Sequence, residues 1–285
     1  MLTTTFDLSN FEQVEIIPIG DLHFGNPLCD EQLFKDTIEY IKEENENEKC
    51  ARICLLNGDL GECITKSSIG DVFEGQVYTP HTQIALITKY LLPLTEKTDK
   101  YPNGKIMSNC YGNHDHFRQY KNEGISVSTT IACNLGLQEV SSSDGCYTFL
   151  KLKGKFRTKD KVIFTIYNQH MTGGGTTIGS KANRVGKISN GIFADLIVGS
   201  HVHTPLTFKE DFIVPSTNTQ TLRQQQITYV ITNSFLRYGD YAQRSGMKPS
   251  NRSVPRIYLY QDKEVAYRNN TRVIDNLKKK IDVII

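Results

Sequence analysis

Gly112-Asn113-His114-Asp115 is the stretch of this chain that best predicts its fold and its chemistry. It follows the strand-like run 105–111, so its polar side chains should emerge at the carboxyl end of a buried strand. Four other short fragments rich in aspartate, asparagine and histidine also follow strand-like runs. They are, in chain order, Gly20-Asp21-Leu22-His23, Asn57-Gly58-Asp59, Gln169-His170 and Ser200-His201-Val202-His203. Of the seven histidines, only His81 and His116 lie outside these five fragments.

The apolar patterns around the fragments predict an α/β fold. Strands are expected over 14–19, 52–56, 105–111, 161–168 and 193–198, each shortly before one of the fragments. Helices are expected over 30–41, with Asp30 as its N-cap, from Pro80 to Leu91, and over 126–135. Further strand-like runs cover 227–232, 256–261 and 264–268, whereas the polar stretch 216–226 is expected to be an exposed loop. Early alternation of strands and helices indicates βαβ units, and the later strands indicate a second sheet packed on the first.

Composition is that of an ordinary globular protein. The 285 residues suit a large α/β domain, with 38% hydrophobic and 22% charged residues. A net charge of +2 neither demands nor excludes a polyanionic partner. The seven cysteines, several of them in apolar runs, are typical of reduced, buried side chains in a cytoplasmic protein. We find no signal peptide and no apolar stretch long enough to cross a membrane, so no membrane partner is expected.

We expect a single domain over residues 1–270 and a C-terminal tail over residues 271–285. The tail contains three consecutive lysines, Lys278 to Lys280, and ends in Val283-Ile284-Ile285. This pattern suggests an amphipathic helix that either covers the core or forms a contact in a homodimer. Of the two, packing on the core is the favoured interpretation.

The donor atoms in the five fragments suit a pair of divalent metal ions. Two such ions about 3.5–4 Å apart can bridge a phosphate, polarise it and activate a water. A bridging carboxylate reduces the repulsion between the ions, imidazole and amide oxygens complete their ligands, and a nearby imidazole can protonate the leaving alkoxide. The five fragments contain each of these groups, which predicts a hydrolase that acts on phosphate esters.

The order D-x-H, G-D, G-N-H-D, H and H-x-H resembles the calcineurin-like metallophosphoesterase superfamily, over roughly Val14 to Pro205. This resemblance implies an α/β (α+β) fold, a four-layer sandwich of two mixed β-sheets flanked by helices. It also implies that one metal is held by Asp21, His23, Asp59 and His203, and the other by Asp59, Asn113, His170 and His201. Asp59 would bridge the two ions, His114 would be the general acid or orient the phosphate, and Asp115 would orient the His114 ring. One departure is Ser200, because the family usually has glycine directly before the last H-x-H.

The same resemblance narrows the substrate. The stretch Gly58-Asp59-Leu60-Gly61-Glu62-Cys63 lacks the G-D-x-x-D-R-G signature of phosphoprotein phosphatases. Asn57-Gly58-Asp59-Leu60, together with G-N-H-D, is closer to the Mre11/SbcD-type DNA exonucleases and related bacterial and phage phosphodiesterases. We therefore expect a bacterial or phage-encoded, dinuclear metal-dependent enzyme that hydrolyses phosphodiester bonds, such as a DNA nuclease. Mn²⁺ is the first choice of metal, and Fe, Zn, Co or Ni also suit ligands of nitrogen and oxygen.

Two alternatives remain open at this point. The enzyme alternative is a phosphatase that acts on nucleotides or other small phosphate monoesters, and the non-enzyme alternative is a metal-binding scaffold without activity. The basic, tyrosine-bearing segment 237–256 includes Arg237 and Arg244, which would contact the substrate in a nuclease. Otherwise the segment is a solvated loop, which is the more common meaning of such a composition.

Overall fold

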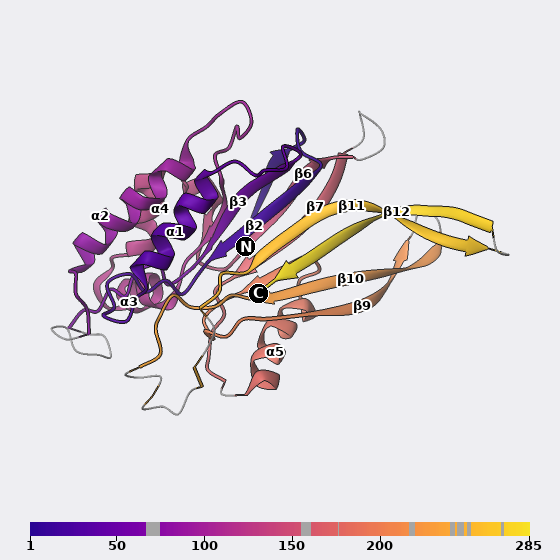
Figure 1. The fold of residues 1–285 in the computed structure, drawn as a ribbon. Helices are drawn as coiled ribbons and strands as arrows, with labels where there is room; N and C mark the ends of the chain where they lie inside the picture. Colours follow the sequence, from indigo (N-terminus) through magenta and orange to yellow (C-terminus); the bar gives the residue numbers. More distant parts are fainter. Residues whose placement is uncertain are drawn as a thin grey trace.

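The structure is a computed structural model, and it describes residues 1–66, 75–154, 161–175, 177–216, 220–239, 243, 248–249, 252–268 and 271–285. Its strands are β1 Leu2–Leu8, β2 Gln13–Ile19, β3 Cys50–Asn57, β4 Ile106–Cys110, β5 Ser141–Ser142, β6 Cys146–Lys153, β7 Lys161–Gln169, β8 Leu196–Gly199, β9 Leu206–Ser216, β10 Thr221–Ile231, β11 Arg256–Arg268 and β12 Thr271–Ile284. They form two six-stranded mixed sheets (Figure 1). Sheet 1 has the order β1-β6-β7-β8-β10-β9, and sheet 2 has the order β12-β11-β2-β3-β4-β5.

The helices begin where the sequence places capping residues. They are α1 Glu31–Lys42, α2 Pro80–Leu91, α3 Arg118–Glu123, α4 Val127–Leu135 and α5 Ile178–Gly186, with short turns η1 Leu92–Thr95, η2 Asn113–Phe117, η3 Gln138–Val140 and η4 Lys187–Asn190. The Asp30 carboxylate accepts a hydrogen bond from the Leu33 N–H group at 3.2 Å, and Pro80 is the first residue of α2. Both helix starts predicted from the sequence are therefore confirmed.

Alternate residues of the central strands face different layers. In β2, Val14 and Ile16 lie in the core between the sheets, whereas Ile17 and Ile19 pack beneath α1, α2 and α4. On the far side of sheet 1, Ile197 of β8 belongs to a third cluster that packs against α5. Each such side chain contributes about 1.5–3 kcal/mol when it is fully buried. The layers run helix, sheet, sheet, helix, so the predicted four-layer sandwich is confirmed (Figure 1).

The C-terminal tail is a strand, so its interpretation as an amphipathic helix is wrong. β12 pairs antiparallel with β11, which in turn pairs antiparallel with β2. The physical reason is a period of two: Ile281 is buried in the core between the sheets, and Val283 packs against the same core. Lys279 shares this face, with its ammonium group 2.8 Å from a carboxylate oxygen of Asp195.

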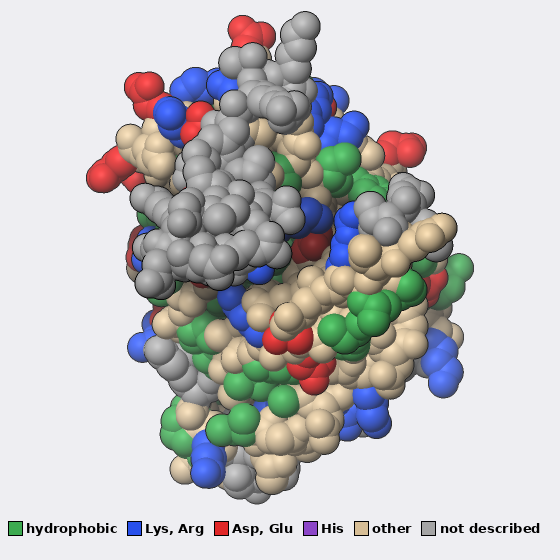
Figure 2. Space-filling model, turned by 90° about the vertical axis from the view of Figure 1, so that its right-hand side faces the viewer, with side chains coloured by type: hydrophobic (Ala, Val, Ile, Leu, Met, Phe, Trp, Pro, Cys, Tyr) green, Lys and Arg blue, Asp and Glu red, His purple; other side chains and the backbone are tan. Residues whose placement is uncertain are grey.

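Two long hairpins, β9–β10 and β11–β12, project together from the sandwich (Figure 1). The β9–β10 hairpin includes residues 221–226, which were predicted to be a loop and instead pair with β9; residues 217–219 lie outside the described residues. From the end at which the hairpins project, charged side chains of both signs surround hydrophobic ones, in keeping with the small net charge (Figure 2).

Two further findings concern the cysteines and the helices. All seven cysteines are free, and every one except Cys133 is buried, as the sequence predicted for reduced structural thiols. Among the described helices, none combines the length and the apolar character that a membrane span requires.

Candidate metal centre

The predicted ligands converge at the carboxyl ends of five strands. β2, β3 and β4 are parallel neighbours in sheet 2, and β7 and β8 are parallel neighbours in sheet 1. Because parallel strands end at the same edge, the loops that follow them meet in one place. Three groups of side chains there have ligand atoms within 4.8 Å of one another: Asp21, His23 and His203; Asp59, His170 and His201; and His23, Asp59 and His114.

The first group contains the residues predicted for one metal. His203 Nε2 lies 3.4 Å from Asp21 Oδ1 and 3.2 Å from His23 Nε2. His23 Nε2 is 3.9 Å from Asp59 Oδ2. Asp21, His23 and Asp59 are buried, whereas the His203 side chain is 36% exposed, so the centre is accessible from the His203 side.

The second group contains the residues predicted for the other metal. His170 Nε2 lies 3.3 Å from Asp59 Oδ2 and 2.9 Å from the amide oxygen of Asn113. The ring of His201 is 5.1 Å from that of His170, measured between centroids. Asp59 Oδ2 thus lies close to imidazoles of both groups, which is the position required of a bridging carboxylate.

The hydrogen bonds of the two carboxylates leave one oxygen of each for a cation. Asp21 Oδ2 accepts from the His201 backbone N–H group, and Asp59 Oδ1 accepts from that of His114, both at 2.7 Å. Asp21 Oδ1 is buried and has no hydrogen-bond partner among the described residues. The His203 imidazole lies 3.4 Å from this buried, ionised oxygen without completing a hydrogen bond to it, so a positive ligand fits this position.

The tautomer of His170 supports the same fit. Its Nδ1 lies 3.0 Å from the Asn57 carbonyl oxygen, which can only accept, so Nδ1 carries the proton. Nε2 faces oxygens of Asp59 and Asn113 and carries a second proton toward them, and a divalent ion that replaced this proton would join all three groups. The departure from the family at Ser200 also has a role, because its hydroxyl lies 2.9 Å from His170 Nδ1 and donates to the Asn57 carbonyl.

The charges of the ligands also favour a cation. Burial opposes ionisation of Asp59, but the His170 imidazole outweighs it and holds the Asp59 pKa well below its usual range. At Asp21 burial is likewise outweighed, there by His203, and the pKa is lowered. Burial lowers the pKa of His201 to about 4, which leaves its ring neutral and able to bind a metal. At His170 the Asp59 carboxylate outweighs burial and raises the pKa to about 10, so the ring carries a proton beside Asp59 that a bound ion would replace.

The backbone around the centre is unusual. Five of the seven predicted ligands have positive φ angles although none is glycine: Asp21 50°, His23 48°, Asp59 49°, His201 86° and His203 50°. Such conformations cluster at functional sites, where the surrounding structure maintains them. Gly112 permits the loops to cross, because a Cβ atom there would lie 2.0 Å from the Asp59 backbone nitrogen.

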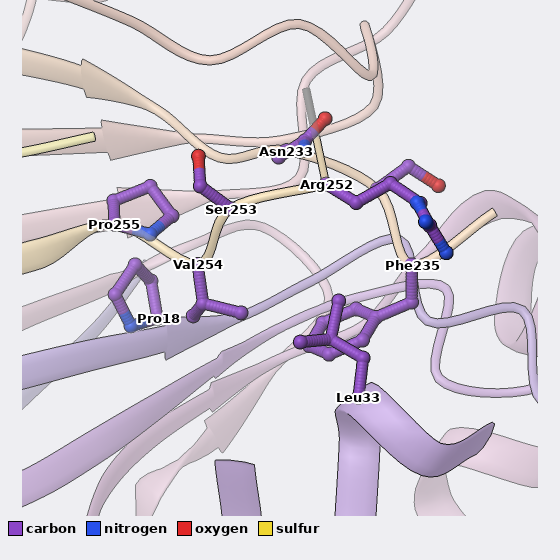
Figure 3. Close-up of a pocket in the computed structure, with 9 residues that line it drawn as sticks. Pro18, Leu33, Asn233, Phe235, Arg252, Ser253, Val254 and Pro255 are labelled. Atoms are coloured by element: carbon purple, nitrogen blue, oxygen red, sulfur yellow. The ribbon is translucent and has the colours of Figure 1, made fainter. Parts of the chain in front are cut away.

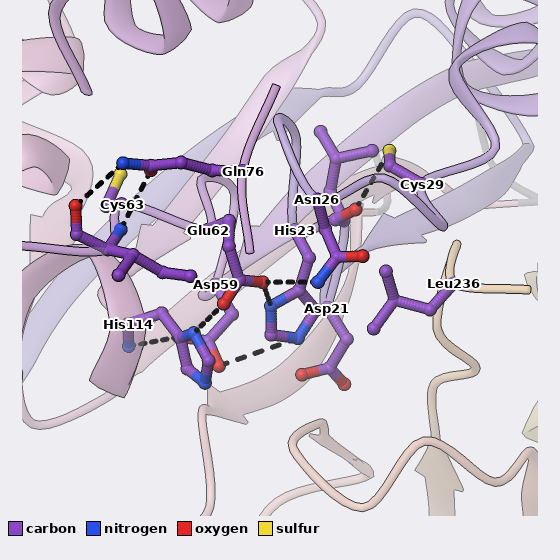
Figure 4. A network of polar contacts seen from close by, with 12 residues as sticks. Asp21, His23, Asn26, Cys29, Asp59, Glu62, Cys63, Gln76, His114 and Leu236 are labelled. Atoms are coloured by element: carbon purple, nitrogen blue, oxygen red, sulfur yellow. Dashed lines mark hydrogen bonds and ion pairs between the residues drawn. The ribbon is translucent and has the colours of Figure 1, made fainter. Parts of the chain in front are cut away.

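His114 lies beside the two groups, but the residue that orients its ring is not the predicted one. Glu62 Oε1 lies 3.1 Å from His114 Nδ1, and Glu62 Oε2 lies 3.0 Å from His23 Nδ1 (Figure 4). Asp115 instead accepts hydrogen bonds from the backbone N–H groups of Gly112 and Leu60, at 3.0 and 2.8 Å. The predicted orientation of His114 by Asp115 is therefore wrong: both Asp115 oxygens are used to fix the loops, and Glu62 orients the ring.

Arg237, one of the two predicted substrate-binding arginines, forms an ion pair away from the predicted metal ligands. Arg237 Nη2 is 3.6 Å from a carboxylate oxygen of Asp30, and Arg252 pairs with the same carboxylate. Arg252 also lines a small hollow with Leu33 and Phe235 (Figure 3). Arg244 lies outside the described residues. Contact of Arg237 with a substrate remains a prediction.

Three residues beside the centre were not singled out from the sequence. Glu62 and Arg118 contact His114, and the Asn57 carbonyl contacts His170. Glu62 stands three residues after Asp59 and Arg118 four after His114, so closeness to the motifs was the available signal. Of the remaining histidines, His81 is exposed, and His116 Nδ1 lies 2.6 Å from the Ser126 hydroxyl.

Comparison with known proteins adds little to this picture. No family model and no curated protein matches the chain. A conserved uncharacterized protein from Streptococcus pneumoniae, described as a predicted phosphoesterase, is 11% identical, with 95% of this chain and 98% of that one covered and a TM-score of 0.35. A double mutant of Vps29 from Entamoeba histolytica is 9% identical, with 96% and 99% covered and a TM-score of 0.33. Because both scores are below 0.5, the functional argument rests on the metal centre.

Proposed function

We propose that this chain is a dinuclear metal-dependent phosphoesterase that hydrolyses phosphodiester bonds, with DNA as the leading candidate substrate. The observation that carries the proposal is the pair of neighbouring ligand groups with Asp59 Oδ2 close to an imidazole of each, at 3.9 Å from His23 Nε2 and 3.3 Å from His170 Nε2, and with His114 beside them. All ligands are nitrogen or oxygen donors, which suits Mn²⁺ as the first choice and Fe, Zn, Co or Ni as alternatives.

Each residue has a defined task in this reaction. Asp21, His23 and His203 would hold one ion, Asn113, His170 and His201 the other, and Asp59 both. When bound, two such ions polarise the phosphate and lower the pKa of a water that attacks it.

His114 would act on the opposite side of the scissile bond from the attacking water. Glu62 holds Nδ1 of this ring, and Nε2 contacts Arg118 Nη2 at 3.0 Å. To act as the acid, Nε2 would carry a proton and exchange its contact with Arg118 for the leaving oxygen. The two Asp59 oxygens have separate tasks, since Oδ1 accepts a hydrogen bond from the His114 backbone while Oδ2, which lies 3.9 Å from His23 Nε2, would be left to hold the ions.

A gel assay tests the proposal directly. End-labelled single- and double-stranded DNA would be incubated with Mn²⁺ and the wild type, beside the Asp59→Asn variant. We expect degradation by the wild type and none by the variant, whose metal content should also fall because the bridging carboxylate loses its charge. Equal turnover in both proteins would refute the assigned role of Asp59.

A monoester substrate and the metal content, measured beside the DNA assay, separate the alternatives. Intact DNA together with rapid hydrolysis of 4-nitrophenyl phosphate would indicate a phosphatase for small monoesters. Hydrolysis of neither substrate by protein that contains two metal equivalents would indicate a scaffold. An empty centre in protein purified without chelator would also favour the scaffold.

A further inference from the structure

Arg118 stands on the face of its helix that points toward the metal centre. η2 is a π-helical turn over Asn113–Phe117, and α3 continues from Arg118. Residues four apart lie one above the other here, because Arg118 contacts His114 while Tyr120 stacks on His116 with ring centroids 5.4 Å apart. The segment thus has one row that faces the centre and a second, aromatic row on another face. Turns of π-helix are frequent at functional sites.

The guanidinium of Arg118 uses only part of its donor capacity. Nη2 lies 3.0 Å from His114 Nε2, the nitrogen that is not held by Glu62. Nη1 is buried and has no hydrogen-bond partner among the described residues. A buried N–H donor without an acceptor is destabilising, so this position favours an incoming acceptor.

We infer that Arg118 binds the non-bridging oxygens of the phosphate group that is hydrolysed. This inference rests on the proposed function and names the residue that selects and positions its substrate. The planar guanidinium offers two parallel N–H donors whose spacing matches two phosphate oxygens. Arg118 reaches the atom of His114 that would protonate the leaving oxygen, so a phosphate bound by Arg118 is presented to that atom.

A role limited to orienting His114 explains less. Glu62 already fixes the ring through Nδ1, and that role gives no reason for the buried donor at Nη1. Phosphate binding accounts for the two terminal nitrogens of the guanidinium, since an anion can accept hydrogen bonds from Nη1 and Nη2 together.

The test compares Arg118→Ala, Arg118→Lys and wild type, each loaded with Mn²⁺. Exposed Arg223 of β10 provides a matched control, Arg223→Ala. Three quantities are measured: metal content, KM and kcat for bis(4-nitrophenyl) phosphate, and the inhibition or dissociation constant of inorganic phosphate. We expect Arg118→Ala to weaken phosphate binding and raise KM by about 10- to 100-fold at unchanged metal content, as for loss of a charge-assisted hydrogen bond. Arg118→Lys should recover part of the loss, and added guanidinium should partly rescue Arg118→Ala.

The other outcomes are also decisive. Unchanged phosphate affinity in Arg118→Ala, with or without a lower kcat, would overturn phosphate binding, and a lower kcat alone would leave orientation of His114. Loss of metal from Arg118→Ala and Arg118→Lys would show that Arg118 maintains the centre instead. If the metal-loaded wild type neither hydrolyses the ester nor binds phosphate, the proposed function itself fails, and this inference fails with it.

Discussion

Replacement of Glu62 by glutamine should impair one histidine of the centre more than the other. Glu62 Oε2 accepts from the Asn26 amide at 3.2 Å as well as facing His23 Nδ1, whereas Oε1, among the described residues, faces His114 Nδ1 alone (Figure 4). The single oxygen of a glutamine would therefore occupy the Oε2 position, because an NH₂ group there would meet donors on both sides. Its NH₂ group would then oppose the Nδ1–H group of His114.

The expected magnitudes follow from this asymmetry. His23 keeps a neutral acceptor in place of a charged one, and outer carboxylates of this kind change metal affinity by about 10- to 100-fold. We expect the lower end of that range for Mn²⁺ in Glu62→Gln. His114 loses its acceptor altogether, at a cost of about 1.5–3 kcal/mol, so kcat should fall by about 10- to 100-fold or more.

The assay is titration of Mn²⁺ by calorimetry, together with the kinetics of bis(4-nitrophenyl) phosphate hydrolysis. The double variant Asn26→Ala/Glu62→Gln is the matched control, because without the Asn26 amide the glutamine can turn its oxygen to His114. It should regain part of kcat and lose further metal affinity. Wild-type affinity and wild-type kcat in Glu62→Gln would refute the assigned orientation of both rings.

Two further predictions concern the backbone crossing and the buried network at the other end of sheet 2. Gly112→Ala places a Cβ atom 2.0 Å from the Asp59 backbone nitrogen, so the variant should lose most of its metal while keeping its far-ultraviolet circular dichroism; wild-type metal content would contradict this. Burial opposes ionisation of Glu15, but hydrogen bonds from Arg52, Tyr258 and Tyr40 outweigh burial and lower the Glu15 pKa. The ionised Glu15 therefore contributes stability above the unfolded pKa of 4.5, and this contribution is lost as the pH falls below that value. Glu15→Gln should therefore be less stable at about pH 7 and lose less stability on acidification to about pH 4, as measured by urea unfolding; equal losses in both proteins would refute the linkage.

Much of the fold and most of the centre could be predicted from the sequence, because those parts are written in local patterns. The strand over 14–19 and the Asp30 cap depend on neighbouring residues alone. The predicted ligands could be named because each follows a strand, and parallel strands bring their carboxyl ends together without further information. The structure brings all seven of these residues together where the carboxyl ends of strands from both sheets meet.

The parts that could not be predicted depend on partners far along the chain. β1 pairs with β6, which begins at Cys146, and more than half of the β1 residues are polar, as suits an edge strand. Residues 221–226 of β10 have almost no buried face, so their pattern lacks the alternation that marks a strand. Glu62, and not Asp115, orients the His114 ring, through a contact between residues 52 positions apart in the chain. No local pattern predicts such a contact.

The left-handed backbone conformation of five predicted ligands predicts which substitutions would be favoured if metal binding were no longer needed. Each non-glycine residue held there costs on the order of 1–3 kcal/mol, and glycine at the same position would remove most of that cost. A lineage released from metal chemistry would gain stability by drifting toward glycine at positions 21, 23, 59, 201 and 203. This chain has aspartate or histidine at all five, so these positions lower its own stability at the residues that metal chemistry would need.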